Sequence, residues 1–419
     1  MNAHGPEALT NPEAWTGVPS ETLEALRSWA DGQAFSITHL RRLTGGRSGA
    51  YVALVGLHVD TRKHAGAVMK LIPPELGQIE SRNAHFARLL CPTNFVEHLS
   101  NSITTSQLSG GWWVQLQELA QIEFEDLVPL GHLAHAPGFA HTCGNVIEAV
   151  TRDWAADSDP PAVSIRPAEF VRDFLGKKQI GLRRFSRKLS RRRHSDPLSI
   201  APKASASISL YFGYGHGDLH VGNVLVPESR PAAHEFVIID HGRFSAATPV
   251  GRDPAKLALS AALSVLSDDE DSEELAEAFV RPHEAVFPHE VVYAAREVLS
   301  AAAFWGASRG LMEAWHRQYL LVLGASALRS VADEYYGLHQ RRWLYEVARM
   351  SFIQFEASSL THPQLRNGQI DSELKSVNKP YAEPTSMSSS RITNNNFNGE
   401  TTGTQTGSES TMHINITRK

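Results

Sequence analysis

The pattern of apolar and polar positions changes near residue 120. Before that point the apolar residues come in short strand-like runs, residues 51–59 and 65–72, separated by the turn-prone "DTRKH". A second pair, "SITTSQL" and "GWWVQLQEL", is joined by a Ser-Gly-Gly turn. Helical periodicity marks "SETLEALRSWA", for which Ser20 is the expected N-cap, and "PPELGQIESRNAHFARLL". The pattern predicts two hairpins in a small sheet accompanied by helices.

From about Gln121 onward the periodicity is mostly helical, as in "DPAKLALSAALSVL" and "QRRWLYEVARMSFIQF". Beyond about Thr361 the chain turns to Ser, Thr, Asn and Gly, which cannot bury enough surface to fold alone. We therefore predict an α+β fold in four parts. These are an N-terminal extension with a helix (residues 1–42), a β-rich lobe (43–120), a helical lobe (121–360) and a disordered polar tail (361–419) that is a candidate for binding a protein partner.

Composition narrows the class of protein further. The 419 residues are 42% hydrophobic and 20% charged, and the net charge of -5 gives no global attraction to nucleic acid or an anionic membrane. The two cysteines, Cys91 and Cys143, lack metal-ligand spacing and are expected to be reduced packing residues. No basic start followed by an apolar stretch opens the chain, and no transmembrane segment is expected. The expected location is the cytoplasm.

The stretch "YGHGDLHVGNVLV" carries more polar side chains than an apolar run normally holds, because each one must find a hydrogen-bond partner. It contains His216, Asp218 and, five residues later, Asn223. This is the spacing of the kinase catalytic loop, in which the Asp accepts a hydroxyl proton and the Asn binds metal. The apolar run "FVIIDHG" then ends in Asp240 and Gly242, which suits a second metal ligand on a sharp turn. A turn cap at Asp218 and an Asx-turn at Asn223 are the structural alternatives.

The motifs "HGDLHVGN" and "IIDHGR" resemble the phosphotransfer signature of the aminoglycoside phosphotransferase and choline kinase group. The resemblance covers residues 43–357 in element order and implies the bilobal protein-kinase-like fold, with ATP and Mg²⁺ as cofactors. It implies that Asp218 deprotonates the acceptor hydroxyl, that Asn223 and Asp240 hold metal, and that His216 supports the loop by bonding backbone near Asp240.

Two departures from protein kinases favour a small-molecule acceptor. His220 stands two residues after Asp218, where protein kinases usually carry Lys, and it either faces substrate or packs in the turn. Only "RFSAATPVGR" separates the acidic turn from the next helix, which leaves little room for a peptide platform. Asp253 follows this segment and either caps the helix or braces the catalytic loop, as an Asp does in the family.

The resemblance also assigns a nucleotide clamp to the β-rich lobe. Gly45, Gly46 and Gly49 would let backbone amides approach phosphate, although glycines are common in hairpins. Lys70 interrupts an apolar strand and would pair with phosphate, held by Glu80 in the next helix; the alternatives are an edge lysine extending to water and Glu75 as its partner. Glu118 would open the hinge that contacts adenine.

A basic segment, residues 177–193, precedes the catalytic region. It is a candidate site for an anionic partner, with a solvated helix as the alternative. The complete pattern predicts an ATP- and Mg²⁺-dependent phosphotransferase acting on a hydroxyl of a small molecule. A kinase-fold signalling module with little or no turnover, a protein kinase and a nucleotidyl-transferring enzyme are the alternatives.

Overall fold

The computed structural model describes most of the chain up to residue 360. The described residues are 9–10, 12–33, 35–43, 49–59, 62–119, 126–155, 162–189, 197–203, 206–229, 235–268, 272–286 and 288–360. The predicted polar tail, residues 361–419, lies outside them.

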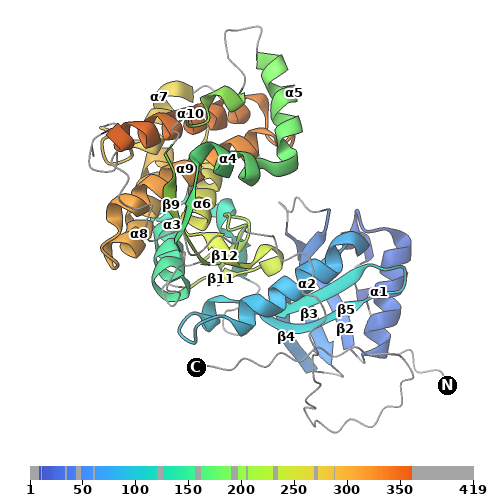
Figure 1. Cartoon of the computed structure of the whole chain (residues 1–419). Coiled ribbons are helices and arrows are strands. Elements are labelled where there is room, and N and C mark those ends of the chain that lie inside the picture. The colour runs from blue at the N-terminus through green and yellow to red at the C-terminus, as the bar shows by residue number, and fades with distance from the viewer. Residues whose placement is uncertain are drawn as a thin grey trace, which may run out of the picture. The chain divides into compact units, whose positions relative to one another are not determined.

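The strands concentrate in the first third of the chain and the helices in the last (Figure 1). The strands are β1 (Leu9–Thr10), β2 (Phe35–Arg42), β3 (Tyr51–Val59), β4 (Arg62–Ile72), β5 (Asn101–Gln107), β6 (Trp113–Glu118), β7 (Leu127–Pro129), β8 (Ala162–Ile165), β9 (Ile208–Gly215), β10 (Val224–Pro227), β11 (Val237–Ile238) and β12 (Ser245–Pro249). The helices are α1 (Ser20–Gly32), α2 (Pro74–Leu89), α3 (Phe139–Ala149), α4 (Pro167–Leu175), α5 (Gln179–Leu189), α6 (Arg252–Val265), α7 (Ser272–Val280), α8 (Glu290–Ala307), α9 (Met312–Val331) and α10 (Leu338–Leu360). The predicted α+β class is confirmed.

The N-terminal region is built on one six-stranded sheet in the order β1-β2-β3-β4-β6-β5. The β3–β4 and β5–β6 pairs are antiparallel, which confirms the two predicted hairpins. Strands β1 and β2 lie within the segment expected as an N-terminal extension, and β2 pairs with β3 along its length. The expected N-cap of α1 is wrong. Pro19 holds the cap position with φ -58°, and Ser20 is the first helical residue.

Alternation along β3 and β4 sends side chains to two different cores, because successive residues of a strand point to opposite faces. Val55 and Met69 are buried with Leu26 of α1 on one face of the sheet. Leu54 and Val68 are buried on the other face with residues of β7, β10 and β11. Lys70 has the parity of Val68, so the strand directs it away from α1 and towards those small strands.

The helical region packs α9 against α10, α3 against α8, and α6 against both α8 and α9. Its core buries large side chains such as Trp305, Trp343 and Phe352. Gly324 of α9 lies against the ring of Phe352 of α10, where any Cβ would overlap it, so this glycine sets the close approach of the two helices.

Two three-stranded sheets, ordered β11-β10-β7 and β12-β9-β8, carry the polar motifs. The loop with His216, Asp218 and Asn223 connects β9 to β10, and Asp240 follows β11 closely. Backbone pairing of β10 with β11 brings Val224 opposite Ile238, so the residues beyond these strand ends are neighbours although they are far apart in sequence.

Candidate functional site

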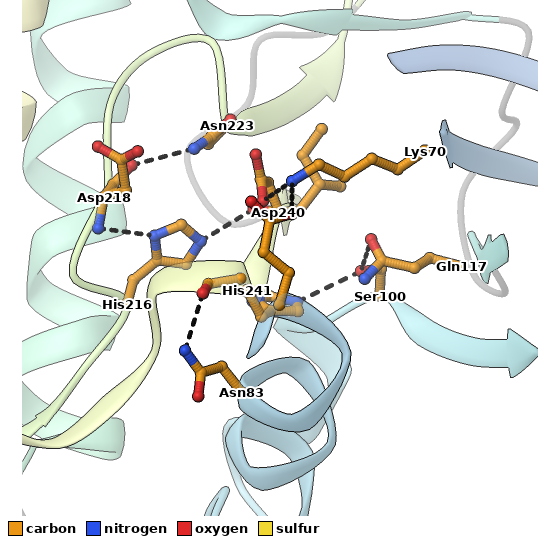
Figure 2. A network of polar contacts seen from close by, with 12 residues as sticks. Lys70, Asn83, Ser100, Gln117, His216, Asp218, Asn223, Asp240 and His241 are labelled. Carbon is orange, nitrogen blue, oxygen red and sulfur yellow. Dashed lines mark hydrogen bonds and ion pairs between the residues drawn. The ribbon is translucent and has the colours of Figure 1, made fainter. Parts of the chain in front are cut away.

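Lys70 lies between two carboxylates from separate elements. Its Nζ donates to Glu80 Oε2 of α2 at 2.6 Å and to Asp240 Oδ1 at 2.7 Å (Figure 2). Lys70 and Glu80 are only 4% and 5% exposed. Burial alone would lower the pKa of Lys70, but Asp240 and Glu80 together raise it, so this lysine is a fixed cation. Neither an edge lysine extending to water nor a pairing with Glu75 matches this geometry.

Asp240 is held in an unusual backbone conformation. It has φ 61° and ψ 58°, the left-handed region, and no other non-glycine residue among those described has a positive φ. Such a conformation costs about 1–2 kcal/mol and persists only where surrounding contacts require it. Burial opposes ionisation of Asp240, yet the Lys70 ammonium beside it holds the pKa of its carboxyl well below the usual range. The carboxylate is therefore charged at every physiological pH.

Gly242 lets α2 approach the turn that follows Asp240. A Cβ there would lie 2.9 Å from Glu80 Cγ, closer than packed atoms normally come. Asn83 of α2 donates its side-chain NH₂ to the Gly242 carbonyl at 2.9 Å (Figure 2). The helix that supplies Glu80 is thereby tied directly to the turn that supplies Asp240.

Asp253, in the first turn of α6, holds the start of the catalytic loop. Its Oδ2 accepts from the His216 backbone N–H at 2.7 Å, and its Oδ1 accepts from Gly217 N–H at 2.9 Å. The carboxylate is 3% exposed, and both oxygens are satisfied by loop amides. Of the two roles expected for Asp253, bracing the loop is the one these contacts match.

The side chain of His216 forms hydrogen bonds only with backbone groups. Its Nδ1 accepts from Asp218 N–H at 3.3 Å, so its Nε2 carries the proton and donates to Ile239 O at 2.9 Å (Figure 2). The side chain is fully buried, and burial lowers its pKa. A neutral imidazole with both nitrogens engaged supports the loop and has no nitrogen left for proton transfer.

Asn223 and Asp218 meet at the far end of the loop. Asn223 Nδ2 donates to the Asp218 backbone carbonyl at 3.0 Å, which leaves the Asn223 side-chain oxygen as its available ligand atom. The Asp218 side chain is 33% exposed and forms an ion pair with Lys256 of α6. The sequence patterns did not point to Lys256. Its position three residues after Asp253 was the available indication, because residues three apart on a helix lie on the same face.

A second layer of polar contacts lies behind Asp240. His241 Nε2 is 3.3 Å from Ser100 Oγ, and Ser100 donates to Gln117 Oε1 at 3.1 Å. His241 is 3% exposed, and burial lowers its pKa to about 3. This histidine is a neutral packing residue that connects the acidic turn to β6 and the residue before β5.

The remaining predicted residues are only partly described. Gly45 and Gly46 lie outside the described residues, whereas Gly49 has φ 74°, a conformation that suits glycine. Glu118 ends β6 opposite Ala67, and the residues that would complete the hinge after Leu119 are not described. His220 Nδ1 accepts from Gly222 N–H at 3.1 Å, a turn contact within the loop.

The basic segment begins in the short 3₁₀ helix Gly176–Lys178 and continues through α5, and its residues up to 189 are described. Leu182 and Phe185 are buried in the helical core, and Arg341 stacks over the Phe185 ring at 4.3 Å. Arg183 and Arg184 are exposed. The chain itself covers Leu182 and Phe185 but leaves Ile180 61% exposed, and an anionic partner for residues 177–193 stays a prediction.

The oxygens available near Lys70 fit a metal bound together with phosphate. Asp240 and Asn223 supply hard oxygen donors, and Mg²⁺ is commonly held by one or two protein oxygens plus substrate phosphates. Within the described ranges no cluster of three or more His, Cys, Asp or Glu residues forms a protein-only metal site. No helix in the described part of the chain has the length and apolar character needed to span a membrane.

Comparison with known proteins finds likeness in structure only. No protein-family model matches the chain, and no curated protein matches its sequence significantly. A glucosamine kinase structure is 15% identical, with 78% of this chain and 77% of that chain covered and a TM-score of 0.35. A thermostable mutant of an aminoglycoside phosphotransferase is 12% identical, covering 78% and 95%, with a TM-score of 0.37. A choline kinase from Cryptosporidium parvum Iowa II is 10% identical, covering 78% and 90%, with a TM-score of 0.37.

These TM-scores are low, so the overlaps carry no conclusion about function. The geometry of the chain itself is more informative. A strand lysine paired with a helix glutamate, next to an acidic turn after a short strand, is the arrangement that protein kinases use at the nucleotide phosphates. The chain has an α+β fold that brings Lys70, Glu80 and Asp240 into this arrangement.

Proposed function

We propose that this chain is a phosphotransferase that uses ATP and Mg²⁺ to phosphorylate a hydroxyl of a small molecule. The observation that carries the proposal is the convergence of Lys70, Glu80 and Asp240 at 2.6 and 2.7 Å, next to a loop that presents Asp218 and Asn223. Strain at Asp240 and burial of a charged lysine both cost free energy. A nucleotide phosphate site explains why both are retained.

Each of the chain's own residues has a role in this proposal. Lys70 would donate to nucleotide phosphate oxygens, with Glu80 holding its ammonium in place. Asp240 and the side-chain oxygen of Asn223 would hold Mg²⁺, which when bound neutralises charge on the phosphates. Asp218 would accept the proton of the acceptor hydroxyl. Alignment and charge neutralisation would supply most of the rate gain.

The short connection from the acidic turn to α6 supports a small acceptor. Only residues 244–251 lie between the turn and α6, and five of them form β12, which pairs with β9. A segment tied into a sheet in this way has no length left to bind an extended peptide. This favours the small-molecule hydroxyl over the protein kinase alternative.

Replacement of Asp218 tests the proposal. Asp218→Asn should lower kcat at least about 100-fold, because a general base is lost, while ATP binding stays unchanged. Asp31→Asn, an exposed aspartate on α1, is the matched control. Products from a panel of hydroxylated compounds and ATP would be identified by mass spectrometry.

Three results would contradict the proposal. Equal turnover in Asp218→Asn and wild type would exclude the role of Asp218. Products carrying a nucleotidyl group would indicate the other transfer chemistry. Thermal stabilisation by ATP without turnover of any compound in the panel or in cell extract would favour the signalling module.

A further inference from the structure

Three arginines from separate elements gather on one side of the catalytic loop. Arg243 ends the turn after Asp240, Arg252 is the first residue of α6, and Arg329 lies in the last turn of α9. Arg252 places its guanidinium carbon 5.4 Å from the centre of the Phe174 ring, and Arg329 Nη1 donates to Phe174 O at 2.7 Å. We refer to these residues as the arginine cluster (Arg243, Arg252, Arg329).

The arginines of the cluster repel one another. Burial lowers the pKa of Arg252; the Asp253 carboxylate opposes this and the positive charge of Arg243 adds to it. Burial also lowers the pKa of Arg329, followed by the charges of Arg252 and Arg243. Arg252 and Arg329 both contact Phe174, and the Arg243 carbonyl packs on Gly217, whose N–H donates to Asp253, the neighbour of Arg252 in sequence.

The carboxylates that act on the cluster are engaged elsewhere. Asp253 uses both oxygens for the amides of His216 and Gly217, and Asp333 is 3.4 Å from Lys178 Nζ. Arg252 Nε is buried and has no hydrogen-bond partner among the described residues. A buried donor of this kind costs free energy unless a ligand satisfies it. The cluster therefore sets three guanidinium groups against the two carboxylates of Asp253 and Asp333 and has one buried donor, Arg252 Nε, without a partner in the described part of the chain.

The cluster lies next to the catalytic aspartate of the proposed reaction. Arg252 and Lys256 are four residues apart on α6 and share one helix face, and Lys256 contacts the Asp218 carboxylate. The Arg243 carbonyl sits where a Cβ on Gly217 would be, so Arg243 packs against the residue preceding Asp218. Arg243 is exposed, which leaves the cluster accessible from solvent.

We propose that the arginine cluster binds an anionic group, a phosphate or a carboxylate, on the same small molecule whose hydroxyl lies at Asp218. The proposal rests on the proposed function, because it names the class of acceptor. Guanidinium groups present pairs of N–H donors that match the oxygens of phosphate and carboxylate. The amino end of α6, where Arg252 lies, adds a favourable dipole for an anion.

Binding of inorganic phosphate without nucleotide tests the site directly. We expect calorimetry to show phosphate binding that weakens at least about tenfold in Arg243→Gln and in Arg252→Gln. Arg27→Gln, an exposed arginine on α1, controls for loss of one positive charge and should bind as wild type does. Because Arg243 is exposed, its replacement should leave the fold intact, which far-ultraviolet circular dichroism would check.

Lys70→Met separates this site from the nucleotide phosphate site. Phosphate binding that survives in Lys70→Met but weakens in Arg243→Gln supports the cluster. Binding lost only in Lys70→Met, or weakened equally in Arg243→Gln and Arg27→Gln, overturns it.

Matched alcohols test the acceptor class. Glycerol 3-phosphate and glycerate should bind more tightly than glycerol to wild type, and this preference should disappear in Arg243→Gln. Equal binding of the charged and neutral compounds would overturn the inference. Phosphate binding at the cluster together with no phosphoryl transfer to any compound would leave the anion site standing and refute the phosphotransferase, so the two failures are distinguishable.

Discussion

The two positively charged groupings beside the β9–β10 loop differ in how their charges are balanced. On one side, Lys70 is 4% exposed and has carboxylate oxygens of Glu80 and Asp240 at 2.6 and 2.7 Å. On the other side, the arginine cluster has a buried Arg252 Nε without a hydrogen-bond partner among the described residues. The lysine is neutralised before any ligand arrives, whereas the three arginines outnumber the two carboxylates, Asp253 and Asp333, that act on them.

This difference separates two ways of preparing a site for anions. A buried ion pair must be partly exchanged when a phosphate binds, and in return it holds its cation in one position. Arginines that outnumber their carboxylates need no such exchange, but they repel one another until a ligand arrives. We therefore expect substitutions on the two sides to have different effects on the free energy of unfolding.

The largest effect is expected at Lys70. Lys70→Met leaves the Glu80 and Asp240 carboxylates close together without a cation, so we expect a loss of about 3–5 kcal/mol in the free energy of unfolding and loss of turnover. Lys256→Met is the matched control, because Lys256 and Asp218 are 23% and 33% exposed and their pair should contribute less than about 1 kcal/mol. Urea unfolding measures both. Equal losses would remove the contrast between a buried and a partly exposed pair.

The second-largest loss of stability is expected at Gly217, where the β9–β10 loop contacts Arg243 of the arginine cluster. It has φ 75°, and a Cβ would overlap the Arg243 carbonyl oxygen. Gly217→Ala should cost about 3 kcal/mol, of which about 1 kcal/mol is backbone strain. Gly138→Ala isolates the strain, since Gly138 has φ 88° and no atom within 4 Å of a Cβ. Similar thermal unfolding of the two variants would show that the loop can move away from Arg243.

Arg252→Met tests the contribution of the arginine cluster to the free energy of unfolding. It removes a repelled charge and an unpaired donor but also the stacking on Phe174, so we expect a change below about 1 kcal/mol in either direction. Arg329→Met, which loses the bond to Phe174 O, should be destabilised by about 1 kcal/mol. A loss at Arg252 as large as that at Lys70 would mean that Arg252 has a structural partner and would end the comparison.

The smallest effect concerns a buried histidine on the α1 face of the six-stranded sheet, where protonation would create a charge without a partner. Tyr51 OH donates to Ala14 O at 3.1 Å, so His39 Nε2–H donates to Tyr51 OH at 2.8 Å, and His39 Nδ1 is left without a partner among the described residues. Burial lowers the pKa of His39 below its ordinary value of 6.5. Below pH 6.5 the unfolded chain binds more protons at this site, so stability falls as the pH falls.

His39→Gln should therefore flatten the fall in unfolding free energy between pH 7 and pH 5 by less than about 1 kcal/mol. His85→Gln, an exposed histidine on α2, should leave the slope unchanged. A slope in His39→Gln that is indistinguishable from that of wild type would show that the imidazole is already solvated in the folded protein.

Local patterns were sufficient to predict the hairpins and the long helices. The places of Lys70, Glu80 and Asp240 were predicted through the resemblance to kinase motifs, because the contact of Lys70 with Asp240 joins residues far apart in sequence. Lys256 and the arginine cluster could not be predicted in this way. They become neighbours of the loop only because α6 and α9 pack beside it, and that packing depends on contacts between residues far apart along the chain.

Some features were mispredicted or missed for local reasons. Ser20 was expected as an N-cap, but Pro19 already supplies the backbone angle needed before the helix, so the helix starts one residue earlier than the cap assignment implied. The six-stranded sheet includes β2, although the β-rich lobe was expected to begin at residue 43. The polar residues of "FSITHLRR" interrupt the alternation of apolar and polar positions that predicts a strand, so β2 was not expected.

Asp253 bonds two consecutive amides of the β9–β10 loop, so the length of its side chain determines how far that loop lies from α6. An aspartate reaches His216 N–H and Gly217 N–H from α6 at 2.7 and 2.9 Å, and one added methylene would push the loop outward by about an ångström. Misplacement on that scale can slow a reaction about 100-fold. A longer acid of the same charge would therefore reposition the reacting group while every functional side chain remained present.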